Sequence, residues 1–140
     1  MGLISTNYRE YETIYVLRPE IEDSLAKDIM LKLKALVEAQ GGINLKVSNW
    51  GRKKLAWERK KYQRGLYVHH AYLALAGVVE EFERNLAINE NVLLRQTILV
   101  SRNINPADKT PEDDELETPV VKEKKEGPRR REDFEEANAY

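Results

Sequence analysis

The chain has 140 residues, of which 41% are hydrophobic and 34% are charged, a composition typical of one soluble globular domain. It contains no cysteine, which excludes disulfides, thiolate zinc sites and a cysteine nucleophile, and we expect no metal and no cofactor. The longest uncharged stretch, residues 65–79, is too short for a membrane span, and residues 1–7 lack the pattern of a signal peptide.

The first half of the chain predicts a strand, a helix and a second strand. Residues 8–17 are rich in aromatic and β-branched side chains, and a proline then ends this strand. From Glu20 the apolar residues recur with the helical period until Gly41-Gly42 stops the helix. Residues 43–57 return to the alternation of a strand, and Gly51 marks a bulge or bend within it.

The second half predicts a strand, a helix and a last strand. Residues 66–76 are apolar on both parities, which favours a position inside a sheet. Residues 78–88 form a short helical stripe, and residues 92–102 are again strand-like. The order β-α-β-β-α-β predicts an α+β, ferredoxin-like fold, in which two helices cover one face of a four-stranded antiparallel sheet.

The other face of such a sheet is open, and it or one edge is available to a partner. Candidate residues for this surface are Tyr67, His69, Tyr72, Arg95 and Thr97. A one-residue slip in register exchanges the two faces, so the sequence leaves their placement undecided.

The charge divides the chain at residue 106. Residues 1–105 hold 16 Lys and Arg against 12 Asp and Glu, whereas residues 106–140 hold 7 against 12 and few large apolar side chains. We therefore expect a folded domain over residues 1–105 and a disordered charged tail over residues 106–140, whose deletion leaves thermal unfolding almost unaltered. Acids follow the tail's Arg129–Arg131 triplet, which favours a solvating role over RNA contact.

Residues 50–64 form the most one-sided segment of the chain. Seven of these fifteen residues are Arg or Lys, and only Glu58 opposes them. Clustered cations release condensed counterions when they meet phosphates, which predicts a nucleic-acid partner; a merely solvating hairpin tip is the alternative. The candidate RNA contacts are Arg52, Lys53, Lys54, Lys60, Lys61 and Arg64, with Arg52 first among them.

Two tryptophans flank this basic block. Trp50 and Trp57 either stack on a base or partner, or anchor the strand by core or edge packing. Their odd spacing puts them on opposite sides of an unbulged strand, at least one of which is buried, so packing is favoured. Trp50, Tyr67 and Arg95 remain the candidate contacts for a protein partner.

Three stretches of the chain carry a family resemblance: Tyr8–Pro19, Trp50–Val68 and Asn89–Arg95. In this order, over residues 8–103, they resemble bacterial small-subunit ribosomal protein six. The combination of Trp-Gly-Arg-basic-basic-Leu-Ala with a later Asn-x-x-Val-Leu is specific. The departures are local, since Trp57 stands where the family usually shows tyrosine, no proline follows it, and Arg59–Gln63 is unusually basic.

The resemblance implies a cytoplasmic, ribosome-associated structural protein that binds the central domain of small-subunit ribosomal RNA. It also implies a heterodimer with small-subunit ribosomal protein eighteen, no catalysis and no small-molecule substrate. Charged C-terminal tails of variable length occur in the family, which fits the break at Pro106.

Two alternatives share the same topology. An RNA-recognition-motif protein needs base-stacking rings where this chain has Leu66 and Val68. An acylphosphatase-like enzyme needs an Arg and an Asn around a phosphate and a glycine-rich cradle after the first strand, where Leu17–Glu20 contains no glycine. His69 and His70 are adjacent on a strand and face opposite ways, so they do not form a catalytic pair.

Overall fold

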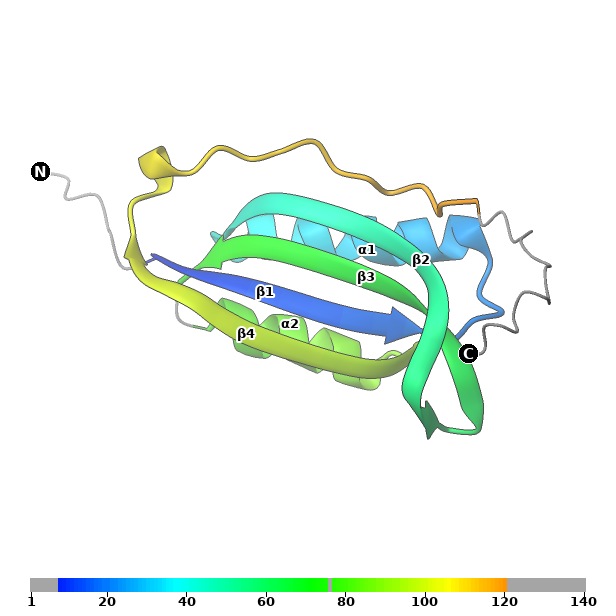
Figure 1. The fold of residues 1–140 in the computed structure, drawn as a ribbon. Coiled ribbons are helices and arrows are strands. Elements are labelled where there is room, and N and C mark those ends of the chain that lie inside the picture. The colour runs from blue at the N-terminus through cyan, green and yellow to red at the C-terminus, as the bar shows by residue number, and fades with distance from the viewer. Residues whose placement is uncertain (1–7, 76, 121–140) are drawn as a thin grey trace, which may run out of the picture.

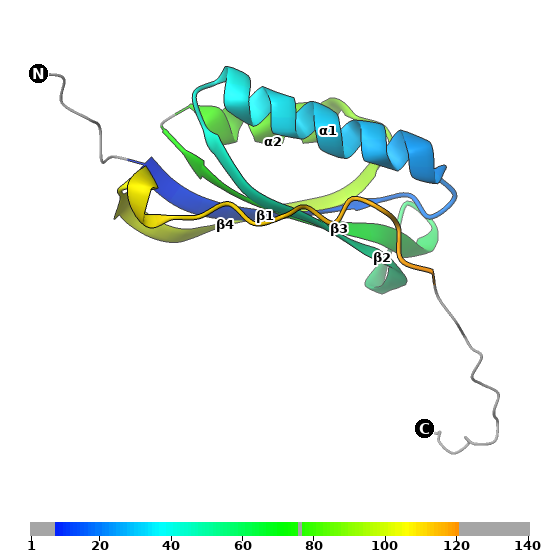
Figure 2. The same cartoon turned by 90° about the horizontal axis from the view of Figure 1, so that it is seen from above.

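The computed structural model describes residues 8–75 and 77–120, which form a sheet with helices on one side (Figure 1). The sheet has the strand order β2-β3-β1-β4, and every neighbouring pair is antiparallel. The elements are β1 (Tyr8–Leu17), α1 (Asp23–Ala39), β2 (Ile43–Arg59), β3 (Tyr62–Ala74), α2 (Val78–Ile88), β4 (Val92–Ile104) and a 3-10 turn, η1 (Pro106–Asp108). Figure 2 shows both helices on the same face, and the predicted ferredoxin-like α+β fold is confirmed.

Aromatic packing joins the helices to the sheet. Tyr72 of β3 stacks on Phe82 of α2 with ring centroids 4.9 Å apart, and neither side chain is exposed. The Tyr72 hydroxyl lies 2.9 Å from that of Thr13 on β1, and Nε2 of buried His70 lies 2.7 Å from Oδ1 of Asn44 on β2. Since a buried polar group without a partner is costly, these hydrogen bonds allow polar residues into the core.

The strand register decides which side chains face the helices. Tyr15 of β1 is fully buried in the core and lies opposite Val68 of β3 and Arg95 of β4. Because cross-strand partners share a face, Arg95 lies on the helix side. Tyr67 and His69, which flank Val68, point to the opposite side, called the open face below.

Of the remaining candidates, Tyr72 and Thr97 also lie on the helix side. Thr97 hydrogen-bonds to the Thr13 hydroxyl at 2.8 Å and donates to Glu83 of α2. The surface predicted for a partner is therefore divided between the two faces.

One boundary of α1 differs from the prediction, and the other agrees with it. Helix α1 begins at Asp23 rather than Glu20, because the chain first turns at Pro19 and buries Ile21. It ends as predicted: Gly41 adopts a φ of +86°, which L side chains rarely allow. Neither helix in the described ranges is long and apolar enough to cross a membrane.

After β4 the chain crosses to the opposite edge of the sheet and runs beside β2 (Figure 1). This segment, residues 106–120, is called the strap. The amides of Glu112 and Glu115 donate to the carbonyls of Leu45 and Val47, each at 2.8 Å, and the amide of Asn49 donates to the carbonyl of Glu115 at 2.7 Å. The strap thus pairs with β2 through backbone hydrogen bonds.

The prediction of disorder from residue 106 is therefore wrong for residues 106–120. Composition measures how much apolar surface a segment can bury, but the strap is fixed mainly by backbone hydrogen bonds and ion pairs. Residues 121–140, including the Arg129–Arg131 triplet, lie outside the described residues.

Candidate nucleic-acid interface

The paired ends of β2 and β3 extend beyond the other two strands as a basic hairpin, residues 52–64 (Figure 1). Lys53 pairs with Gly65, and Lys54 pairs with Arg64, so cations occupy both strands. The hairpin closes between Arg59 and Tyr62 through a two-residue turn. Its ladder places the predicted RNA contacts along one projecting element.

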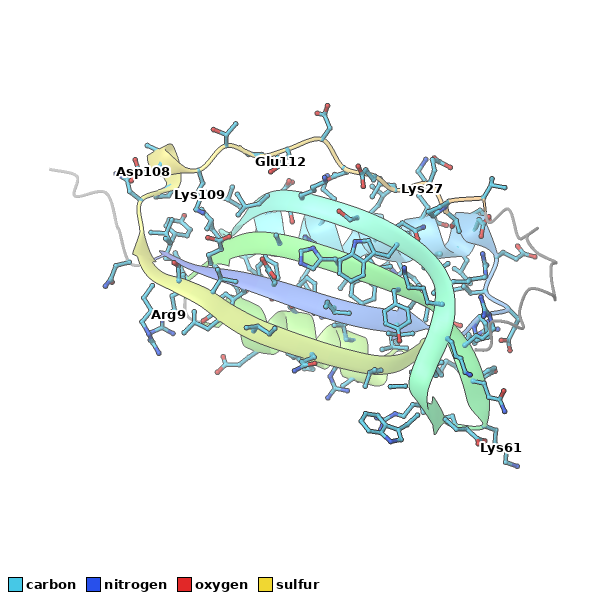
Figure 3. The ribbon with its side chains drawn as sticks, in the orientation of Figure 1. Arg9, Lys27, Lys61, Asp108, Lys109 and Glu112 are labelled. Carbon is cyan, nitrogen blue, oxygen red and sulfur yellow. The ribbon has the colours of Figure 1, made fainter. Side chains whose placement is uncertain are left out.

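Lysine occupies both positions of the closing turn. Lys60 and Lys61 have φ angles of +50° and +70°. A two-residue hairpin turn with positive φ at both positions normally contains asparagine or glycine, so lysine here carries a strain cost. In Figure 3 the Lys61 side chain lies at the far end of the hairpin and points away from the sheet.

Five of the six predicted RNA contacts are exposed: Lys53, Lys54, Lys60, Lys61 and Arg64. Within residues 8–75 and 77–120, no carboxylate forms an ion pair with any of them. Among the described residues, the Arg64 guanidinium donates only to the Arg52 carbonyl, at 3.3 Å. The hairpin therefore presents its positive charge to solvent.

Arg52, the first candidate, is placed differently. Its guanidinium donates to the carbonyls of Pro19 at 2.7 Å and Ile21 at 2.6 Å, and lies 3.1 Å from Oδ1 of Asp23. These three groups belong to the β1–α1 turn and the first residue of α1. Arg52 thus joins the hairpin to the body of the domain, and most of its donors are already used.

A small second core fixes the base of the hairpin. Leu55 packs with Val16 and Leu93 on the open face, and Tyr62 and Tyr67 border this cluster. The hydrophobic contacts are made on the side of the sheet away from the helices. They turn the hairpin into an arm with an anchored base.

Glycine is required at the base of this arm, where β3 begins to pair with β1. A side chain at Gly65 would approach Cγ1 of Val16 to 2.3 Å and the carbonyl of Leu17 to 3.0 Å. Tyr62 adds a hydrogen bond of 2.6 Å to Glu20, which lowers the pKa of that carboxyl and raises the pKa of the tyrosine. Sequence reasoning missed this anchoring; the only available signal was a glycine inside a strand pattern.

The prediction of core packing is wrong for both tryptophans, whereas edge packing holds for Trp50, which stacks on His69 from the edge strand β2. Trp57 is 80% exposed and Trp50 is 43% exposed, so neither belongs to the core. The spacing argument assumed an unbulged strand, but the β2–β3 register shifts between Asn49 and Gly51. Gly51 has a φ of +87°, and the predicted bulge there is confirmed.

The three candidate partner contacts do not share one surface. Trp50 stacks on His69 with ring centroids 5.1 Å apart, on the open face. Tyr67 lies on the same face beside the second core. Arg95 lies on the helix side, where its Nε donates to Glu83 at 2.8 Å.

The arginine and asparagine of the acylphosphatase alternative are also present. Nε of Arg18 donates to Oδ1 of Asn91 at 2.5 Å, and Glu20 lies 3.5 Å from the same guanidinium. The two groups therefore bind each other, and a carboxylate beside them repels an anion. In the part of the chain that the structure describes, no cluster of three His, Cys, Asp or Glu side chains suits a metal.

Comparison with known proteins assigns the family. The family model described as "Ribosomal protein S6" matches residues 10–99. Among bacterial relatives named "Small ribosomal subunit protein bS6", that of Desulforapulum autotrophicum is 37% identical over 70% of this chain and 63% of its own length. Those of Thermosynechococcus vestitus and Clostridioides difficile are 32% and 40% identical, over 81% and 66% of this chain and 95% and 99% of their own lengths.

A solved structure agrees with this assignment at the level of the fold. The crystal structure of 30S ribosomal protein S6 from Thermotoga maritima has a TM-score of 0.63 and is 22% identical. The similarity covers 66% of this chain and 88% of that protein. With the family model spanning most of the sheet and both helices, this chain belongs to the ribosomal protein S6 family.

Proposed function

We propose that this chain is a structural component of the bacterial small ribosomal subunit, located in the cytoplasm on the ribosome. In this role it binds the central domain of small-subunit ribosomal RNA together with small-subunit ribosomal protein eighteen. The proposal assigns it no catalysis and no cofactor. The observation that carries the RNA part is the basic hairpin, whose exposed cations have no acidic partner within the described ranges.

The hairpin is better suited to contacting a phosphate backbone than to recognising a base sequence. Its cations are spread over two paired strands and a turn, so they can follow a line of phosphates. Phosphate contacts position a protein on structured RNA, whose helices are recognised largely by shape. In this proposal the contacts are Lys53, Lys54, Lys60, Lys61 and Arg64, while Arg52 positions the arm.

The open face supports a protein partner. Trp50 is 43% exposed, and Ile98 and Val100 of β4 are 49% and 45% exposed. Exposed aromatic and aliphatic side chains around a partly buried centre are typical of protein interfaces. A single partner on this face reaches Trp50 and Tyr67, but not Arg95 on the other side of the sheet.

The test is a binding titration with a central-domain RNA fragment, with and without the eighteenth protein. We expect binding that weakens steeply with salt, and tighter binding when both proteins are present. Absence of binding to this RNA at low salt, even with the partner added, would refute the proposal. A phosphatase assay on an acyl phosphate is the control for the enzymatic alternative, and we expect no turnover.

A further inference from the structure

A buried asparagine connects the strap to β2. Asn49 is 4% exposed, and its side-chain amide donates to the Leu116 carbonyl at 3.2 Å and to the Thr118 hydroxyl at 2.9 Å. Its backbone amide donates to the Glu115 carbonyl at 2.7 Å. Because a buried amide without acceptors is costly, the docked strap is what makes an asparagine at this position favourable.

The same side chain also holds the bulge of β2. Oδ1 of Asn49 accepts a hydrogen bond of 2.9 Å from the Gly51 amide. In the β2–β3 ladder, Asn49 and Gly51 pair with consecutive residues of β3, which leaves Trp50 as the extra residue. The carboxamide therefore bonds to the strap through its nitrogen and to the bulge through its oxygen.

The strap closes the bulge from the outside through Pro119. A side chain added at Gly51 would come within 3.3 Å of the proline ring. Gly51 has a φ of +87°, a conformation that glycine adopts easily and also leaves easily. The Asn49 carboxamide on one side and the Pro119 ring on the other restrict it to this conformation.

The bulge decides where the side chains around it lie. Without the extra residue, every later side chain of β2 would change faces. With it, Trp50 stacks on His69 on the open face, which is the proposed surface for a protein partner. Arg52 donates to the carbonyls of Pro19 and Ile21 beside the start of α1 and so anchors the hairpin.

We propose that Asn49 is a positioning residue through which the docked strap holds the bulge, so that the basic hairpin and Trp50 keep one relative orientation for binding. The inference rests on the RNA-binding function proposed above. If the bulge adopts several conformations, only the fraction with a correctly placed hairpin binds RNA, and the apparent affinity falls by that fraction. The strap thus contributes to RNA binding without contacting the RNA.

Substitutions in the full-length chain test this inference on the central-domain RNA fragment with protein eighteen present. Asn49→Ala removes the carboxamide, and Thr118→Val keeps the shape of the strap side chain but removes its hydroxyl acceptor. The two substitutions are also combined. The matched control is Thr110→Val, the same substitution at an exposed position of the strap. Filter binding over a salt series measures the affinity and the salt slope.

We expect Asn49→Ala to weaken RNA binding about five- to tenfold and Thr118→Val about two- to threefold, because fewer folded molecules hold the hairpin correctly. The double variant should bind no more weakly than Asn49→Ala, since both substitutions break the same connection. The salt slope should stay unchanged, because no phosphate contact is lost. Unchanged affinity of Asn49→Ala, fully additive losses, or an equal loss in Thr110→Val would overturn the inference.

The fluorescence of Trp50 distinguishes positioning from a general loss of stability. Trp50 and Trp57 are the two tryptophans of the chain, so in a Trp57→Phe background the emission comes from Trp50. A loosened bulge should release Trp50 from His69 and shift its emission to longer wavelength in folded Asn49→Ala and Thr118→Val, measured without RNA. Thr110→Val should show no shift. Unchanged emission of folded Asn49→Ala would overturn the inference, because the bulge would then not depend on the carboxamide.

The design separates this inference from the function beneath it. If the full chain binds RNA and the substitutions Lys60→Gln and Lys61→Gln weaken binding while Asn49→Ala does not, the coupling through Asn49 fails and the hairpin site stands. If the full chain does not bind this RNA at low salt, both proposals fail.

Discussion

The hairpin and the strap are both densely charged, but they use their charges in opposite ways. The hairpin's lysines face solvent at the end of an anchored arm, with no acidic partner in the described ranges. Four acids of the strap instead lie against lysines of α1 and β2. One segment keeps its charge available for another molecule, whereas the other uses it within the domain.

The difference shows that charge density alone does not distinguish charge that faces solvent from charge used in contacts within the domain. Geometry distinguishes them, because the strap runs beside an edge strand with free backbone groups, and the hairpin's backbone is already paired within itself. Each prediction below tests one side of this contrast.

The largest effect is expected from removing the hairpin's charge. Replacing Lys53, Lys54, Lys60 and Lys61 together by glutamine should reduce the salt slope of RNA binding by about three units, since each lost phosphate contact contributes about 0.7 to 0.9. Stability should change little, because these side chains are exposed.

The matched control for this variant replaces four exposed cations outside the hairpin by glutamine: Arg9, Lys32, Arg84 and Arg102. Filter binding over a salt series measures both proteins. An equal loss of slope in the control would mean that net charge, and not the hairpin, determines binding.

Removing the strap should destabilise the domain. A chain ending at Asn105 loses three backbone hydrogen bonds to β2 and the ion pairs of the strap. After the gain in chain entropy, the free energy of unfolding should fall by about 2 to 3 kcal/mol. Urea unfolding measures it, and a chain ending at Val120 is the control, which should match the full protein. Equal stability of all three would show that the strap does not stay docked.

His70 should make stability fall in mild acid. Burial lowers its pKa to about 3, with Lys34 and His69 acting in the same direction and Asp114 opposing them. The unfolded histidine takes up a proton below about pH 6.5, which the folded one does not, so the free energy of unfolding drops as pH falls below that value. From pH 7 to pH 5 the loss should be about 2 kcal/mol, at 1.36 kcal/mol per unit.

The control for this effect is His70→Gln, which can still hydrogen-bond to Asn44 and should flatten the pH dependence. Shortening the chain to Asn105 should leave the slope between pH 7 and pH 5 unchanged, because loss of Asp114 lowers the pKa of His70 further, away from this range. If the pH dependence between pH 7 and pH 5 disappears when the strap is removed, it arises from the strap's ion pairs and not from His70.

The smallest effect is expected at Arg52. Arg52→Gln removes the hydrogen bonds to the carbonyls of Pro19 and Ile21 and should cost about 1 to 2 kcal/mol of stability. The salt slope should stay unchanged, because the guanidinium is held by the domain. Arg52→Lys keeps the charge but not the planar donors, and should be nearly as unstable. A slope reduced by about 0.7 to 0.9 in the glutamine variant alone would make Arg52 a phosphate contact.

The sequence predicted the elements because their periodicities are strong. The stripe that ends at Val37 identifies a helix, and the aromatic and β-branched residues around Tyr15 identify a strand, without tertiary information. Residues whose role depends on distant parts of the chain were not predictable. Gly65 is needed because the Val16 side chain fills the space that a side chain at residue 65 would require. The Arg52 guanidinium is already hydrogen-bonded because the β1–α1 turn places carbonyls beside it.

In the candidate site, too, local features were predictable from the sequence and features set by tertiary contacts were not. The exposed cations followed from charge counting, whereas the positions of Trp50 and Trp57 did not, since a single extra residue at Gly51 breaks the alternation on which the argument depended. The strap escaped detection because its partner is an edge strand more than sixty residues earlier in the chain.

The strap also affects where other copies of the chain can pair with the edges of this sheet. A sheet with two bare margins can add further copies on both sides and grow into a fibre. Here one margin is occupied by a segment rich in carboxylates and containing Pro111 and Pro119, which is a poor template for another strand. Main-chain pairing with another copy is thereby blocked along residues 45–49 of β2, whereas the opposite margin, β4, keeps unused backbone groups.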